Sequence, residues 1–284
     1  MRKVPARRSD CAAHAMDEAS IRWLATFTQR KHLRAPTLET LDDCPKEALA
    51  VARIVWHRRV VNETRSVAIG QALHRFAKAA ACDTAVLDAF QRLELDETTH
   101  VELASAVLKR LGVSNIVVSA DTTALVFPNE PAVTSLMRLV LTGLCICESV
   151  SASRFACVRE HTDLEVFRAC IELFYRDELT HAELGFVSAP LVAAALRDEF
   201  GEERAQALFL DELRATFGEM DRVVGMNLER SGGVPPERPQ PKPNPGVVEP
   251  AMDARAFYQS MHDDILPRLE SLGFPALEAW KTRA

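Results

Sequence analysis

The chain has 284 residues, of which 48% are hydrophobic and 26% are charged, a balance typical of a globular protein that can bury a full core. Its formal net charge of -6 gives no electrostatic reason to expect nucleic acid as a partner. No uninterrupted apolar run reaches the roughly 18 residues that a membrane span requires, and no apolar signal segment follows the basic start. The sequence therefore predicts a cytoplasmic protein that contacts no membrane.

The seven cysteines of the chain are scattered and none forms a CxxC pair. An odd number of scattered cysteines is typical of free thiols in a reducing compartment. The missing CxxC pairs also exclude a rubredoxin-type iron site.

The pattern of apolar residues predicts long helices over most of the chain. Residues 1–46 are weakly patterned apart from Ile21 to Phe27, so we expect an N-terminal extension with one short helix. From Ala48 to Glu229 glycine is scarce and apolar residues recur with the 3.6-residue period. The fold class predicted is all-α. The helices are expected at 47–80, 84–111, 131–160 and 163–186, with one or two more between Pro190 and Leu228.

The connections between these helices indicate their arrangement. Asp83 or Thr84 can cap the helix that follows, and residues 162–165 (TDLE) resemble a capping box, so each short connection predicts an antiparallel hairpin. The segment between Gly112 and Pro131 lacks a helical period and is long enough to cross the length of a bundle. We therefore expect a four-helix bundle with a long crossover within a domain over residues 47–230.

A proline-rich segment separates this domain from the end of the chain. Residues 231–250 contain seven of the 15 prolines, which predicts an extended strap. A further helix is expected at 251–272, with Phe257 and Met261 on its apolar face. We expect residues 231–284 to form a strap and a C-terminal helix that pack on the bundle.

The most informative feature of the sequence is an internal repeat. The word DETTHVEL at residues 96–103 recurs as DELTHAEL at residues 177–184, with six of eight letters identical. Within each word, Glu and His stand three residues apart, on one face of a helix, where both side chains can reach a single metal ion. The repeat thus nominates Glu97 with His100, and Glu178 with His181, as metal ligands.

Two further glutamates occupy matching positions in the partner helix of each hairpin. Glu63 lies before Glu97 and Glu148 before Glu178, and in both cases the midpoint falls near the predicted turn. Folding each hairpin at that turn brings its two glutamates to the same level. The predicted metal ligands are Glu63, Glu97, His100, Glu148, Glu178 and His181, and we expect Glu97 and Glu178 to be the bridging and catalytic carboxylates.

This order of ligands resembles the ferritin-like di-iron carboxylate superfamily, in which two helices each supply a Glu and two others each supply Glu-x-x-His. The resemblance covers residues 47–186, about half of the chain. It implies two iron ions in a four-helix bundle, and it leaves the reaction open. The chain is also distantly similar to the p-aminobenzoate N-oxygenases, but Phe174 stands where that family has an additional histidine ligand.

Surface glutamates in salt bridges are the alternative interpretation of these positions. That interpretation explains single residues, but it does not explain six ligand-type residues on predicted inward faces. For Glu102 and Glu183, two residues beyond each histidine, a solvated surface position is favoured.

Asp96 and Asp177 precede the two ligand glutamates and point away from the metal, because neighbouring residues on a helix diverge by about 100°. Metal-bound imidazoles commonly donate their second N–H to a carboxylate. We expect a crossed arrangement in which Asp96 holds His181 and Asp177 holds His100. Solvation, or pairing with nearby cations such as Arg176, is the alternative.

Four carboxylates and two imidazoles suit iron, or else manganese, better than copper or structural zinc. The sequence favours an O2-activating non-haem di-iron oxidase or oxygenase that hydroxylates, N-oxygenates or desaturates a small organic substrate. The extra length after the metal helices favours this class over iron storage. A bacterioferritin-like ferroxidase or storage shell and a manganese catalase remain as alternatives.

The expected partners follow from this chemistry. They are O2, a small-molecule substrate and an electron donor such as a reductase or ferredoxin. The oligomeric state is left open, and a homodimer is one alternative. Nucleic acid and membrane are not expected.

Overall fold

The computed structural model describes residues 19–20, 22–24, 41, 44–118, 125, 127, 129–233, 235–236, 240 and 242–283. The described residues form helices, turns and extended connections, and none of them belongs to a strand. The predicted all-α fold class is confirmed. Most of the predicted N-terminal extension lies outside the described residues, although residues 22–24 of its expected short helix are helical.

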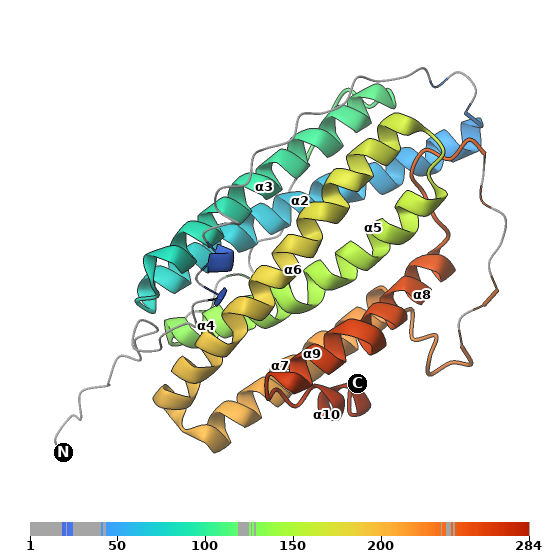
Figure 1. The fold of residues 1–284 in the computed structure, drawn as a ribbon. Coiled ribbons are helices and arrows are strands. Elements are labelled where there is room, and N and C mark those ends of the chain that lie inside the picture. The colour runs from blue at the N-terminus through green and yellow to red at the C-terminus, as the bar shows by residue number, and fades with distance from the viewer. Residues whose placement is uncertain are drawn as a thin grey trace, which may run out of the picture.

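The order of the elements follows the predicted hairpins. The long helical runs lie side by side (Figure 1), a layout compatible with a four-helix bundle. The elements are α2 (Lys46–Ala79), α3 (Thr84–Arg110), α4 (Ala132–Arg138), η3 (Leu139–Glu148), α5 (Ser149–His161), α6 (Glu165–Phe200), α7 (Glu202–Val223), α8 (Pro250–Ser260), η4 (Met261–Ile265), α9 (Leu266–Ser271) and α10 (Ala276–Lys281).

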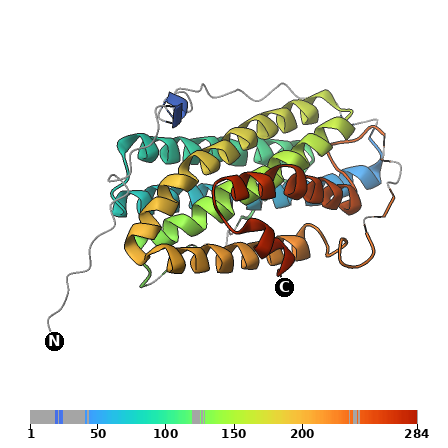
Figure 2. The same ribbon diagram turned by 60° about the horizontal axis from the view of Figure 1, so that its bottom comes forward.

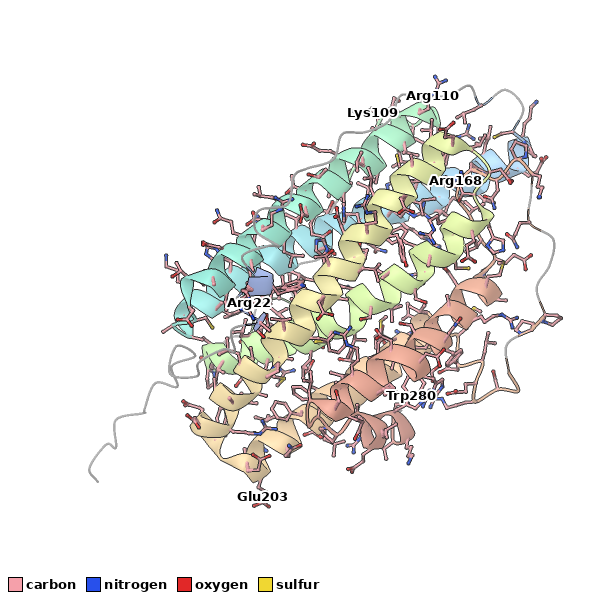
Figure 3. All side chains as sticks on the ribbon, viewed as in Figure 1. Arg22, Lys109, Arg110, Arg168, Glu203 and Trp280 are labelled. Carbon is pink, nitrogen blue, oxygen red and sulfur yellow. The ribbon has the colours of Figure 1, made fainter. Side chains whose placement is uncertain are left out.

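The crossover connects opposite ends of the molecule. Helix α3 ends beside Lys109 and Arg110 at one end, whereas Glu203, in the first turn of α7, lies at the other (Figure 3). Helix α4 begins near the end of the molecule where α7 starts (Figure 1), so the end of α3 and the start of α4 lie at opposite ends of the core. Residues 119–124, 126 and 128 of this connection lie outside the described residues.

Helix α6 is longer than predicted because it continues through Pro190 to Phe200. Proline has no N–H for the helix ladder, so the sequence predicted an end before it. Pro190 is exposed, while Ala189, Leu191 and Val192 around it are buried, and this packing holds the helix together. The helix ends instead at Gly201, whose φ of 81° is a conformation that favours glycine.

The helical run 132–161 contains a segment that the sequence did not predict, the π-helix η3. Helix α6 approaches this segment closely at Gly185. A Cβ on Gly185 would lie 2.6 Å from Leu144 Cβ and 2.7 Å from the backbone nitrogen of Cys145. The missing side chain therefore allows α6 and η3 to pack nearly backbone to backbone.

The predicted capping box at residues 162–165 does not form. Helix α6 has Leu164 at its N-cap and receives no side-chain cap. Thr162 donates its hydroxyl hydrogen to the carbonyl of Val158 at 2.6 Å, and the carboxylate of Asp163 accepts the backbone N–H of Asn244 at 3.0 Å. Asp163 thus holds the proline-rich segment. Asp83 is the N-cap of α3, as expected, but it also makes no side-chain cap.

The described part of the proline-rich strap packs against the start of α2 and the turn before α6. Trp56 Nε1 donates to the carbonyl of Pro245 at 3.2 Å, and Arg59 Nη2 donates to that of Gly246 at 3.1 Å. The buried side-chain oxygen of Asn244 accepts the N–H groups of Gly246 and Val247. These contacts fix residues 244–247 against the helical core.

The C-terminal helices form a second layer beside the core. Helix α8 and η4 pack along α5, and α7 packs against α6 and η3 (Figures 1 and 2); Phe257 and Met261 are fully buried. The helix predicted at 251–272 is present as the continuous run of α8, η4 and α9. Helix α10 follows it and buries Trp280.

By length and composition alone, two helical stretches of the described chain, Ala132–His161 and α6, are apolar enough to cross a membrane. Within the protein, 83% and 67% of their most apolar windows are buried. Core helices of soluble proteins pass the same test, so these stretches are weak grounds for a membrane span. The expected absence of membrane contact stays a prediction.

Candidate metal centre

The structure brings all six predicted ligand residues together inside the helical core. The six residues come from four elements. Helix α2 carries Glu63, α3 carries Glu97 and His100, η3 ends in Glu148, and α6 carries Glu178 and His181. None of the six is more than 6% exposed. Hairpin formation places the glutamates level with each other, as the spacing from the turns predicts.

The first group consists of Glu63, Glu97, His100 and Glu178, whose nearest ligand atoms all lie within 4.8 Å of one another. His100 directs Nδ1 at the carboxylates. This nitrogen lies 3.3 Å from Glu97 Oε2 and 3.5 Å from Glu63 Oε2. It lies 3.8 Å from Glu178 Oε1.

The second group consists of Glu97, Glu148, Glu178 and His181, again with ligand atoms within 4.8 Å of one another. His181 Nδ1 lies 2.9 Å from Glu97 Oε1 and 3.7 Å from Glu178 Oε2. Glu97 and Glu178 belong to both groups and offer one oxygen to each side. The cluster therefore contains two adjacent sites that share two carboxylates.

The polar atoms of this cluster fit metal ions better than they fit one another. Both side-chain oxygens of Glu97, Oε2 of Glu178 and Nδ1 of His100 are buried without a hydrogen-bond partner in the described part of the chain. Leaving such atoms unsatisfied is costly, and buried polar groups are normally bonded. A cation in each group would satisfy these atoms, so the donor set fits two metal ions.

The electrostatics of the carboxyl groups support the same conclusion. Burial raises the pKa of Glu148 and Glu178 well above the ordinary value, and it raises that of Glu63 to about 7. Burial also acts to raise the pKa of Glu97, but the charges of His100 and His181 lower it overall. Without a cation, the cluster holds protons because four buried carboxylates cannot all be charged.

Both imidazoles are basic in this environment. Burial acts to lower the pKa of each ring, but the surrounding carboxylates outweigh it. Glu97 is the main cause for His100, whose pKa is raised well above the ordinary value. Asp96 and Glu97 raise the pKa of His181 to about 10. A metal ion that binds at Nδ1 must therefore displace a proton.

The second nitrogen of each imidazole faces the aspartate of the opposite repeat. His100 Nε2 lies 3.2 Å from Asp177 Oδ2, within hydrogen-bonding distance. His181 Nε2 lies 3.7 Å from Asp96 Oδ2, which is long for a hydrogen bond. Each aspartate thus faces the histidine of the other repeat, as the sequence suggests. That the aspartates support the metal ligands stays a prediction.

The two aspartates differ in a way that the repeat conceals. Asp96 Oδ1 accepts a hydrogen bond from Arg92 Nε at 2.9 Å and forms an ion pair with Arg92 Nη2 at 2.8 Å. Although burial acts to raise it, the pKa of Asp96 is lowered by His181 and Arg92. Leu173 occupies the position before Asp177 that corresponds to Arg92, so the second repeat supplies no guanidinium there. Arg92 lies outside the repeated word, and the sequence did not single it out.

Aromatic rings close one side of the cluster. Phe174 is fully buried, and its ring centroid lies 4.6 Å from that of His100. Phe155 stacks on Phe174 at 5.1 Å. Since these rings exclude water from the His100 side, they keep the local dielectric low.

The two outer glutamates of the repeat have different positions. Glu102 is exposed, as expected. The side chain of Glu183 is 40% exposed and accepts a hydrogen bond from Arg268 Nη2 at 2.5 Å, so it links α6 to α9 at the surface of the protein. The C-terminal helix supplies this partner from a distant part of the sequence.

Comparisons of the chain with protein-family models, with curated proteins and with solved structures found no match. What the cluster does must therefore be inferred from its own residues. The structure establishes an all-helical protein with a buried Glu/His cluster that can hold metal ions and is compatible with a di-iron site.

Proposed function

We propose that the protein is a ferritin-like di-iron oxidase or oxygenase that uses O2 to oxidise a small organic molecule. The observation that carries this proposal is the pair of overlapping ligand groups joined by Glu97 and Glu178. Two metal sites that share carboxylates are the arrangement expected of a di-iron carboxylate protein. The oxygen-rich donor set suits iron best, with manganese as the other candidate.

When bound, two iron ions in these sites would supply the two-electron chemistry needed to reduce O2. The chain contributes the surroundings. Glu97 and Glu178 would hold both ions, Asp177 would orient the ring of His100 through Nε2, and Phe174 would keep water from that side. An electron donor such as a reductase or ferredoxin would complete the cycle, and a cytoplasmic location suits such a donor.

The C-terminal layer supports an enzyme over an iron-storage shell. Helices α7 to α9 lie on one side of the helical core (Figures 1 and 2), and Ser260 Oγ donates to the carbonyl of Ser149, the residue after Glu148, so this layer covers the core next to the metal centre. Enclosure of this kind suits a site that must admit one substrate and exclude water.

The metal assignment can be tested by counting iron in single variants. Because Glu97 and Glu178 belong to both groups, replacing either with Ala should remove most of both ions. Glu63 belongs to one group, so Glu63→Ala should weaken one ion and leave the other. Circular dichroism should show retained helix in all three variants. Full iron occupancy in Glu97→Ala or Glu178→Ala would refute the assignment.

The reaction class requires separate measurements on the iron-loaded protein. Two results together support the oxygenase proposal. The absorption spectrum should show that O2 oxidises the bound iron, and the protein should elute from size-exclusion chromatography as a monomer or dimer. Elution as a very large assembly would instead indicate a storage shell, and bound manganese with peroxide disproportionation would indicate a catalase.

A further inference from the structure

Arg59 is a buried cation close to the proposed metal centre. It lies on α2 one helical turn before Glu63 and is 8% exposed. Its guanidinium carbon lies 4.3 Å from the centroid of the Trp56 ring and 5.5 Å from that of Phe155. Nη2 donates to the carbonyl of Gly246 in the strap. Its Nη1, which is also buried, donates to no acceptor in the described part of the chain.

A buried guanidinium is normally paired with a carboxylate. Among the described residues no carboxylate forms an ion pair with Arg59. Asp253, the acid whose charge affects it most, is bound to Arg154 at 2.6 Å. Burial lowers the pKa of Arg59 to about 10, so the side chain still carries its charge at neutral pH. The site thus presents a buried charge that has no ion-pair partner among the described residues and has an open donor.

Metal binding would leave the positive charge of Arg59 with less compensation from nearby carboxylates. Four carboxylates balance two divalent cations, so Glu63 would no longer offset the charge of Arg59 once the ions are bound. Aromatic rings connect Arg59 with the metal centre. Phe155 lies beside the guanidinium and stacks on Phe174, which contacts the ring of His100. An anion beside Arg59 would therefore lie in apolar surroundings next to the metal centre.

We propose that Arg59 binds the carboxylate of a small organic substrate through Nη1 and directs the rest of that molecule toward the metal centre, an inference that rests on the proposed function. A carboxylate fits better than a phosphate because its single charge matches one guanidinium. A doubly charged phosphate would keep an uncompensated charge among aromatic rings. The hydrogen bond to Gly246 orients the guanidinium so that Nη1 remains available.

The test compares hexanoate with its neutral counterpart hexanamide by anaerobic calorimetric titration of the iron(II)-loaded protein. Wild type should bind hexanoate about ten- to a hundredfold more tightly than hexanamide, the range for a hydrogen bond between charged groups. Arg59→Gln should lose most of this preference. Arg59→Met, which removes the charge at similar length, provides the same measurement if Arg59→Gln does not fold. Arg58→Gln removes an exposed arginine from the same turn and should keep the full preference.

Two results would overturn the inference while leaving the metal centre in place. One is iron-loaded wild type that does not prefer hexanoate. The other is an Arg59 variant that binds hexanoate as tightly as wild type, which would mean that the metals hold the carboxylate and that Arg59 only anchors the strap. Iron content measured on each sample separates these results from a failure of the proposed function, because a wild type without iron would overturn both.

Discussion

The unequal support of the two imidazoles leads to a prediction about Asp96 and Asp177. Asp177→Asn changes the acceptor for His100 Nε2 from a charged to a neutral group at a distance of 3.2 Å. Hydrogen bonds to charged groups contribute about 1.5–3 kcal/mol and neutral ones about 0.5–1.5 kcal/mol. The loss is therefore about 1–1.5 kcal/mol, or roughly tenfold in metal affinity. The 18% exposure of the Asp177 side chain places the effect at the lower end.

Asp96→Asn should act mainly on the fold. The distance of 3.7 Å from Asp96 Oδ2 to His181 Nε2 is longer than the 3.2 Å between Asp177 and His100, so the direct contact with the imidazole should be the weaker of the two. The same change removes the negative charge that Arg92 contacts through two nitrogens inside the protein. Weakening this buried ion pair should lower the stability of the metal-free protein by about 1–3 kcal/mol. Its effect on metal affinity should be smaller than that of Asp177→Asn.

The assay for this pair is a chelator competition for iron(II) under anaerobic conditions, combined with thermal unfolding of the metal-free proteins. Glu102→Gln is the control, since it removes one exposed negative charge near His100 without touching the cluster. Metal affinity in Asp177→Asn equal to that of the control would refute the role of Asp177. A drop in Asp96→Asn confined to metal affinity, with unchanged melting, would refute the role assigned to Arg92.

Three further perturbations follow from the structure. Because the pKa of Glu63 is raised to about 7 and that of His181 to about 10 in the metal-free protein, iron(II) should displace protons. Affinity should therefore rise from pH 6 to pH 8, and metal added to a weakly buffered sample should acidify it; a constant pH would contradict this. Gly185→Ala should lower the melting temperature and the metal affinity, because the added Cβ would lie 2.7 Å from the backbone of η3. Gly143→Ala should change both less, because its Cβ would meet only a side-chain carbon at 3.3 Å. Asn244→Ala removes three hydrogen bonds inside the strap, so it should lower the stability of the protein by about 1–3 kcal/mol and speed proteolysis after residue 231. An unchanged melting temperature would show that the strap contributes nothing to stability.

Much of the cluster could be predicted from the sequence because its geometry is largely local. Glu97 and His100 share a helical face by their spacing, and the repeat supplies the matching pair Glu178 and His181. Counting residues from each turn places Glu63 and Glu148 at the level of these pairs. Local periodicity and turn position therefore sufficed to nominate the six residues that the structure brings together.

Features that depend on contacts between distant segments could not be predicted in this way. The sequence around Pro190 indicates a helix end, and only the packing of its buried neighbours carries α6 past it. The π-helix before Glu148 has no local signature, and it packs against Gly185 from another helix.

The surroundings of the centre were also decided by tertiary structure. Arg59 stands in an ordinary helical pattern, and its burial depends on the strap carbonyl of Gly246, 187 residues later in the chain. Arg92 pairs with Asp96 one turn away on the same helix, a contact that helical spacing allows, but only folding places Asp96 opposite His181. Helical spacing determines which side chains share a face within a few turns. Burial and the charge of neighbours depend on segments that meet only when the chain is folded.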